Sequence, residues 1–126
     1  MPRTVLIVED TDTCRSMLEI ALARIPDIHL QLVASGEEAL AFLKNAAICA
    51  MITDVHLPKM DGFELIENLR GQDAYAHVPI LAISGDSDPR TPERLFRLGA
   101  SAFFSKPYSP ARVREKLEQF IHASQL

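Results

Sequence analysis

The sequence predicts an α/β fold, a doubly wound five-stranded parallel sheet covered by helices on both faces. Apolar runs alternate with segments of helical periodicity five times along the 126 residues, as in sheets built with right-handed crossovers. Four of the five apolar runs are short and almost continuous, which is typical of parallel strands buried on both sides. The length predicts that residues 1–126 form a single domain.

One of the five predicted strands differs from the others in its pattern. The second alternates, with His29 and Gln31 between apolar neighbours, which predicts an edge strand. The predicted strands are TVLIV (4–8), IHLQLV (28–33), ICAMIT (48–53), PILAIS (79–84) and SAFFS (101–105).

Helical patterns follow each predicted strand. Thr91 with Pro92 after it predicts the N-cap and first turn of the fourth helix, which ends at Gly99. The other predicted helices are 12–25, 36–45, 62–69 and a last one from Pro110. The residues at helical spacing are, in the same order, Met17, Ile20, Ala21 and Arg24; Ala39, Leu40 and Leu43; Phe63, Ile66 and Leu69; and Val113, Leu117, Phe120 and Ile121.

Composition excludes several classes of protein. A hydrophobic content of 48% argues against disorder, and a net charge of −4 without a basic patch argues against direct nucleic-acid binding. The sequence has no apolar run of membrane-span length and no signal peptide, so we expect a cytoplasmic protein with no membrane contact. Cys14 and Cys49 have no metal-type spacing and are expected to be reduced thiols, a disulfide being the less favoured alternative.

Three carboxylates stand at the carboxyl ends of two predicted strands. Glu9 and Asp10 follow the first strand, and Asp54 follows the third. These strands are central neighbours in a doubly wound sheet, so the three side chains should converge at the edge where such folds place their sites. Like charges so close need a cation, and hard oxygen ligands suit Mg²⁺ or Mn²⁺ better than zinc.

Two more polar groups follow the fourth and fifth strands. Ser84 follows ILAI and Lys106 follows AFFS. A hydroxyl and an ammonium facing a metal-bound carboxylate suit a phosphoryl group, and they predict covalent aspartyl-phosphate chemistry. Taken singly, the polar residues at the predicted strand ends and in the loops after them have simpler interpretations. Asp12 could cap the first helix, Ser84 could be an ordinary loop residue, and Lys106 could be solvated. Their joint placement at one edge favours the site.

The chain resembles the receiver domain of two-component response regulators, of the chemotaxis-regulator type, over essentially its whole length. The matching stretches are LIVEDTDTCR, ITDVHLPKMDGFELI, PILAISGDSD and GASAFFSKP. The resemblance implies a flavodoxin-like (βα)5 fold with strand order 2-1-3-4-5.

The resemblance also implies a metal-dependent phosphoacceptor site. Asp54 matches the phosphoacceptor, and Asp10 matches the direct acidic ligand of Mg²⁺. Glu9 contributes through coordinated water, and the backbone carbonyl of His56 is a further metal ligand. Glu9 replaces the commoner aspartate, a variation that should leave metal binding intact.

Other matching positions imply a switch. Ser84 engages the phosphoryl group, Lys106 pairs with it, and a cis peptide precedes Pro107. Phe103 occupies the aromatic switch position but lacks the hydroxyl of a tyrosine, so its switching would depend on packing. His56 and Asp86 occupy the positions that tune the lifetime of the phosphoryl group, in a direction that the sequence does not give.

The function implied is transfer of a phosphoryl group from a sensor histidine kinase or a histidine phosphotransfer protein to Asp54. Phosphorylation would switch the face formed by the fourth helix, fifth strand and fifth helix toward a downstream partner, an output domain or a second copy of the chain. We expect slow self-dephosphorylation and no turnover activity. The start at Met1 favours a free-standing regulator over a phosphorelay intermediate or a domain of a larger protein.

Two alternatives compete with this interpretation. A magnesium-dependent aspartyl phosphatase of the haloacid dehalogenase type needs a second aspartate two residues after Asp54, where this chain has His56. A receiver-like interaction module that is never phosphorylated would not need all of the chemical positions, and here they are filled.

Overall fold

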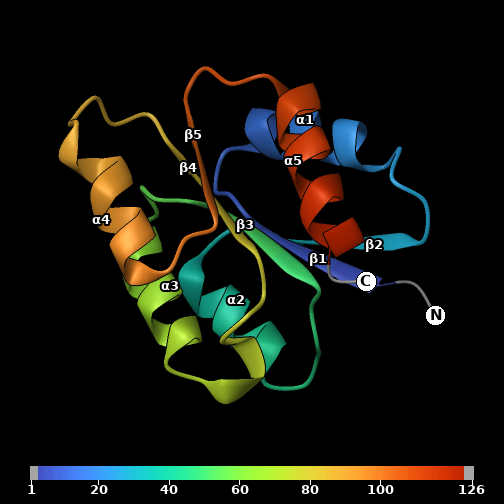
Figure 1. Ribbon diagram of the computed structural model, residues 1–126, viewed down its shortest axis with the longest axis horizontal. Coiled ribbons are helices and arrows are strands. Elements are labelled where there is room, and N and C mark those ends of the chain that lie inside the picture. The colour runs from blue at the N-terminus through green and yellow to red at the C-terminus, as the bar shows by residue number, and fades with distance from the viewer. Residues whose placement is uncertain (1–2, 124–126) are drawn as a thin grey trace.

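The computed structural model describes residues 3–123 and contains a five-stranded sheet with helices on both faces (Figure 1). All neighbouring strands are parallel, and their order is β2-β1-β3-β4-β5. The predicted doubly wound fold and strand order are therefore confirmed. The elements are β1 (Arg3–Val8), α1 (Asp12–Leu22), β2 (Ile28–Val33), α2 (Gly36–Leu43), β3 (Ala50–Asp54), α3 (Gly62–Arg70), the 3-10 helix η1 (Asp73–Tyr75), β4 (Ile80–Ser84), α4 (Arg90–Leu98), β5 (Ala102–Ser105) and α5 (Pro110–Ala123).

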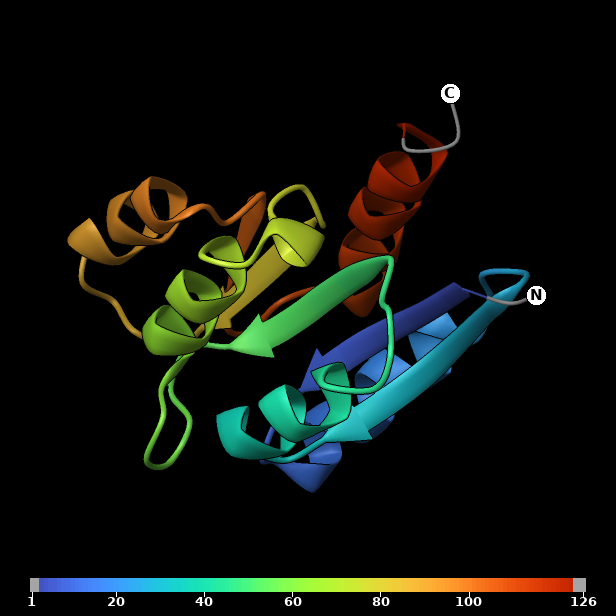
Figure 2. The same ribbon diagram turned by 90° about the horizontal axis from the view of Figure 1, so that it is seen from below.

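Helices cover the two faces of the sheet as two separate layers. α1 and α5 pack on one face, and α2, α3 and α4 pack on the other (Figures 1 and 2). In β1, Leu6 and Val8 join the core under α2, α3 and α4, whereas Val5 and Ile7 join the core under α1 and α5. Since successive strand residues point to opposite faces, burial on both sides requires apolar residues at consecutive positions of the strand.

The edge strands are only partly predictable. β2 lies at one edge, as its alternating sequence predicts, and its His29 is exposed. β5 forms the other edge, but Phe103 and Phe104 are only half-buried there. The sequence of β5 does not predict an edge strand, because its two consecutive large apolar residues, Phe103 and Phe104, are typical of a buried strand.

The residues whose spacing predicts α1 do not form its buried face. Met17 is 44% exposed and Ile20 is 71% exposed, whereas Leu18 and Leu22 are completely buried. Ile25, seven residues after Leu18, extends the same apolar side beyond the helix end and is also buried. α1 thus carries two overlapping apolar stripes, and the longer one faces the sheet.

α4 begins before its predicted cap. Pro89 is the N-cap and Arg90 the first helical residue, so Thr91 lies inside the first turn. The Thr91 hydroxyl donates a hydrogen bond to Asp86 Oδ2 at 2.9 Å instead of capping the helix. The prediction of Thr91 as N-cap is wrong, because a hydrogen bond to an ionised carboxylate is stronger than a neutral one. The predicted end at Gly99, where φ is 113°, is confirmed.

Most other boundaries lie close to the predicted ones. The predicted strand 48–53 is β3 (50–54), so Asp54 is the last residue of the strand. The first two helices end at Leu22 and Leu43, two or three residues earlier than predicted. The short helix η1 was not predicted.

Gly62 allows α3 to begin directly against the segment that follows Asp54. Its N–H donates to the carbonyl of Val55 at 2.8 Å. A Cβ atom on Gly62 would lie 2.6 Å from the Asp54 carbonyl oxygen. Cβ atoms essentially never approach a backbone atom so closely, so any other residue here would force the backbone to shift. Asp61 caps the helix by accepting the Glu64 N–H at 2.9 Å. The loop after the predicted phosphoacceptor is thus closed by a backbone hydrogen bond between Val55 and Gly62, and the Asp61 side chain at its end caps α3.

The structure also bears on the predicted thiols and on membrane contact. Cys14 and Cys49 are free and half-buried, and burial raises the pKa of both thiols. Within residues 3–123, no helix has both the length and the apolarity that a membrane crossing requires.

Candidate functional site

Three carboxylates converge at the carboxyl edge of the sheet, as the sequence predicts. β1 and β3 are parallel neighbours, so the residues at and just after their carboxyl ends share one edge. One oxygen each from Glu9, Asp10 and Asp54 lies within 4.8 Å of the other two. Glu9 and Asp54 are buried and Asp10 is exposed. The cluster therefore extends from the interior of the protein to its surface.

The Glu9 carboxyl group is buried, and its pKa is raised. Its side chain is 1% exposed, and its Oε1 accepts the backbone N–H of Thr11 at 3.1 Å. Burial, and then the negative charge of Asp54, raise the pKa of Glu9 from 4.5 to about 7. Its Oε2 is buried and has no hydrogen-bond partner among the described residues.

Asp54 is held on both of its oxygens. Oδ2 accepts from Lys106 Nζ at 2.6 Å, and Oδ1 accepts the backbone N–H of His56 at 3.0 Å. Lys106 Nζ also lies 3.6 Å from Glu9 Oε2. Partial burial acts to lower the pKa of Lys106, but its hydrogen bond to Asp54 and the charge of that carboxylate outweigh burial and raise it. Lys106 therefore stays an ammonium beside the carboxylate.

The acidic cluster fits a divalent cation. Two buried carboxylates and one exposed carboxylate face a single ammonium, so negative charge remains uncompensated. The unpartnered Oε2 of Glu9 is a buried acceptor that a metal-bound water can satisfy, since buried polar atoms rarely stay unpaired. All donors are hard oxygens, which suit Mg²⁺ or Mn²⁺. The metal role of the His56 backbone carbonyl stays a prediction.

Ser84 and Phe103 lie on the same face of neighbouring strands. Phe103 pairs with Ala82 across β4 and β5, and Ser84 follows Ala82 by two residues, so it points to the same side. Ser84 is completely buried, and Phe103 packs against the core under α2, α3 and α4. The peptide between Lys106 and Pro107 is cis, as the resemblance implies.

A polar network links the predicted residues Ser84, His56 and Asp86 to Thr91 of α4. His56 Nε2 lies 3.2 Å from Ser84 Oγ and 3.7 Å from Asp86 Oδ2. Thr91, which is 5% exposed, donates to the same Asp86 oxygen. Hydrogen bonds from the Asp88 backbone N–H and from Thr91 lower the pKa of Asp86. The sequence did not indicate Thr91 as a member of this network. Its position five residues after Asp86 is the feature that could have suggested this contact.

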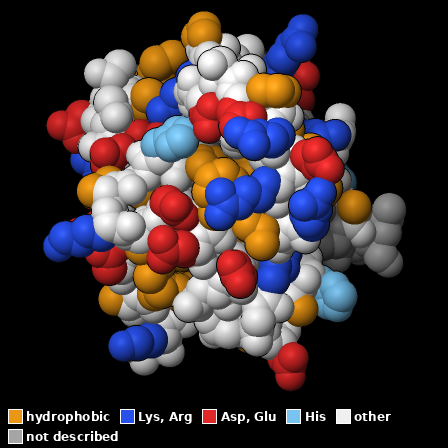
Figure 3. Space-filling view, turned by 90° about the vertical axis from the view of Figure 1, so that its left-hand side faces the viewer, with side chains coloured by type: hydrophobic (Ala, Val, Ile, Leu, Met, Phe, Trp, Pro, Cys, Tyr) orange, Lys and Arg blue, Asp and Glu red, His pale blue; other side chains and the backbone are white. Residues whose placement is uncertain are grey.

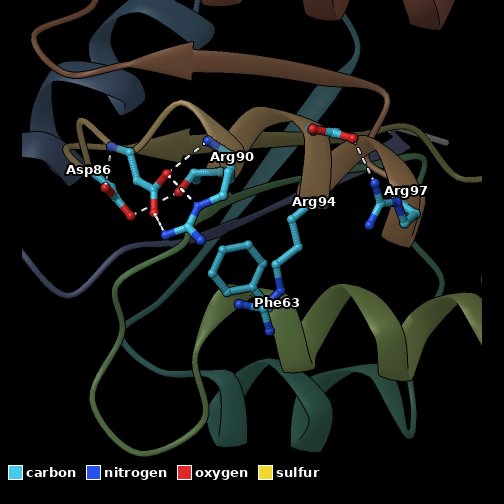
Figure 4. Close-up of a pocket in the computed structure, with 8 residues that line it drawn as sticks. Phe63, Asp86, Arg90, Arg94 and Arg97 are labelled. Carbon is cyan, nitrogen blue, oxygen red and sulfur yellow. Dashed lines mark hydrogen bonds and ion pairs between the residues drawn. The ribbon is translucent and has the colours of Figure 1, made fainter.

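A groove of about 540 Å³ between α3 and α4 was also not predicted (Figure 4). The Arg94 guanidinium lies 3.9 Å from the centroid of the Phe63 ring, a cation–π contact. Charges of both signs intermix around a small apolar area on this face (Figure 3), and the acids of the groove match its arginines in number. The groove therefore has no excess charge to select an ion. Its lining residues are Phe63, Asp86, Asp88, Arg90, Thr91, Glu93, Arg94 and Arg97.

Fold and site together define a doubly wound α/β domain. At the carboxyl edge of its sheet it has a cluster of carboxylates that fits a divalent cation and an ion pair between an aspartate and a lysine. Residues 5–118 match the family model of the response regulator receiver domain. The chain therefore belongs to the response regulator receiver domain family, and the resemblance seen in the sequence is confirmed.

Relatives come from more than one signalling context. A chemotaxis protein CheY homolog of Campylobacter jejuni is 28% identical over 117 residues, which are 92% of this chain and 90% of that protein. The crystal structure of a putative response regulator from Chloroflexus aurantiacus is 32% identical, with a TM-score of 0.88 and coverage of 97% and 99%. The receiver domain of a signal transduction histidine kinase from Syntrophus aciditrophicus is 30% identical, with a TM-score of 0.87 and coverage of 96% and 91%. These similarities do not assign the chain to either context.

Proposed function

We propose that Asp54 is phosphorylated by the phosphohistidine of a sensor histidine kinase or of a histidine phosphotransfer protein. The observation that carries this proposal is the 2.6 Å contact between Lys106 Nζ and Asp54 Oδ2, made beside a cluster of three carboxylates. A carboxylate nucleophile with one cation on it and ligands for another matches the requirements of phosphoryl transfer.

In the proposed reaction, an Asp54 carboxylate oxygen attacks the phosphorus of the phosphohistidine. The new P–O bond forms as the P–N bond breaks, and the departing imidazole nitrogen keeps the electron pair of the broken bond. The Lys106 ammonium offsets negative charge on the phosphoryl oxygens. The hydrogen bond from the His56 N–H to Oδ1 orients the carboxylate, so that little reorganisation is needed.

The acidic cluster would hold Mg²⁺, with Mn²⁺ as a possible substitute. Asp10 and Asp54 are the direct carboxylate ligands, Glu9 acts through a coordinated water, and the His56 backbone carbonyl completes the protein ligands. When bound, Mg²⁺ supplies charge neutralisation for the transferring phosphoryl group. The buried, unpartnered Oε2 of Glu9 supports this assignment.

Phosphorylation adds up to about two negative charges at Asp54, and we propose that Ser84 turns toward the new phosphoryl oxygen. Phe103, on the same face of the adjacent strand, would then move into the space that Ser84 leaves. The affected surface is the α4-β5-α5 face, where a groove of about 580 Å³ is lined by residues that include Phe96, Phe103 and Lys116. A downstream protein, an output domain or a second copy of the chain would bind there.

Loss of the phosphoryl group ends the signal in this proposal. His56 and Asp86 lie next to Ser84, where they can affect access of the hydrolytic water. Hydrolysis is expected to be slow, so the domain is a switch and not a turnover enzyme.

Intact-mass analysis after incubation with acetyl phosphate and Mg²⁺ tests the proposed function. The wild type should gain one phosphoryl group only with Mg²⁺, and Asp54→Asn should gain none. Asp73→Asn is the matched control, since Asp73 is an exposed aspartate on η1, and it should behave like the wild type. No gain in the wild type, together with no binding of beryllofluoride, would instead support an interaction module that is never phosphorylated.

A further inference from the structure

The Ser84 hydroxyl is held by two neighbours outside the Asp54–Lys106 pair. Its Oγ accepts the backbone N–H of Asp86 at 2.9 Å and lies 3.2 Å from His56 Nε2. A hydroxyl has one donor and two acceptor positions, so these contacts use two of the three. The two hydrogen-bond partners of the Ser84 hydroxyl are therefore His56 and the backbone of Asp86, and not Asp54 or Lys106.

The His56 imidazole is partly exposed and lies near Asp86 as well as Ser84. Its side chain is 54% exposed, and Nε2 is 3.7 Å from Asp86 Oδ2. Asp86 in turn accepts from the Thr91 hydroxyl at 2.9 Å and from the Asp88 N–H at 2.7 Å, and Figure 4 shows Asp86 among the residues at the groove beside α4. The carboxylate beside the imidazole is therefore fixed to the first turn of α4.

We propose that His56 is a positioning residue that retains Ser84 in its resting orientation. This inference rests on the proposed function, because the competing partner of Ser84 is a phosphoryl group on Asp54. The inference takes the neutral His56 tautomer in which Nε2 accepts the Ser84 O–H. That O–H must leave His56 before it can donate a charge-assisted hydrogen bond to the phosphoryl group. The Asp86–Thr91 hydrogen bond makes α4 part of the same resting arrangement.

This role differs from tuning the lifetime of the phosphoryl group. A side chain that tunes lifetime acts on the hydrolytic water and changes the rate of dephosphorylation. A side chain that retains Ser84 changes the equilibrium for occupying the site, and it does so only when the Ser84 hydroxyl is present. The two roles can therefore be separated by a double-mutant cycle.

The test is a titration of the full chain with beryllofluoride, a phosphoryl mimic, in the presence of Mg²⁺, followed by ¹H–¹⁵N NMR. His56→Ala should bind the mimic about two- to tenfold more tightly than the wild type, the range expected for removing one neutral hydrogen bond. His56→Gln, whose amide can reach the position of Nε2, should restore the wild-type midpoint. His77→Ala is the control, since His77 is exposed between η1 and β4.

The Ser84→Ala background gives the deciding result. There, adding His56→Ala should leave the midpoint unchanged, since no hydroxyl remains to be released. Equal midpoints for the wild type and His56→Ala would overturn the inference, and so would a shift of the same size in the Ser84→Ala background. Absence of any binding by the wild type would remove the proposed function and this inference together, whereas binding with equal midpoints removes only the inference.

Discussion

Replacing Glu9 with glutamine tests how much the ionisation of a buried carboxyl group at the carboxyl edge of the sheet lowers the free energy of unfolding. The Glu9 side chain is 1% exposed, and its Oε2 has no hydrogen-bond partner among the described residues. Burial, followed by the charge of Asp54, raises its pKa to about 7. When Glu9 is protonated it can donate a hydrogen bond to Asp54, and a glutamine amide can do the same at every pH.

The direction of the pH effect follows from the raised pKa. Below pH 4.5, the ordinary pKa of Glu9, the carboxyl group is protonated in both the folded and the unfolded chain, and its contribution to stability is fully present. As the pH rises through about 7, the folded protein must bury the ionised form, and this contribution is lost. At about 1.36 kcal/mol per pKa unit, the loss is on the order of 3 kcal/mol for the metal-free protein.

Urea denaturation followed by circular dichroism, with EDTA present, measures this loss. The free energy of unfolding of Glu9→Gln relative to the wild type should increase by about 2 kcal/mol between pH 5 and pH 8. Glu19→Gln, at an exposed position of α1, should stay within about 0.5 kcal/mol of the wild type at both values. A Glu9→Gln difference that is the same at both pH values would show that ionisation of Glu9 does not destabilise the folded protein.

Three further predictions concern other contacts, one of them with a control substitution. Lys106→Met, which removes the 2.6 Å contact to Asp54, should slow phosphoryl uptake from acetyl phosphate by about 10- to 100-fold in a mass time course; an unchanged rate would contradict the role given to the ammonium. Gly62→Ala should lower the free energy of unfolding by about 1–3 kcal/mol, because its Cβ meets backbone. Gly71→Ala, where the nearest such atom is at 3.6 Å, should not, and equal losses would contradict the argument. Arg70→Ala removes hydrogen bonds to two backbone carbonyls and should cost about 1–3 kcal/mol in urea denaturation; full stability would show that these bonds contribute nothing.

The sequence predicts most of the site because the site depends on strand ends. Asp54 and Glu9 follow short apolar runs of the length of buried strands, and the rule that parallel strands end at one edge brings their side chains together. Lys106 follows from the same rule. Such predictions need the order of elements and not the details of packing.

Features that depend on side-chain packing could not be predicted in this way. α1 has two apolar stripes that overlap, and contact with the sheet selects the stripe of Leu18 and Leu22. The hydrogen bond of Thr91 to Asp86 joins a helix to the preceding loop, and the Arg94–Phe63 contact joins two helices. Neither contact leaves a periodic pattern in the sequence.

The central claim is that a phosphoryl group becomes bonded to the carboxylate of Asp54. Borohydride reduces an aspartyl phosphate to homoserine, so reduction after treatment with acetyl phosphate and Mg²⁺ marks the phosphorylated residue for peptide mass spectrometry. We expect homoserine at position 54 and at no other aspartate, and none when Mg²⁺ is omitted. Homoserine at another position, or a stable phosphoryl group that borohydride does not remove, would contradict it.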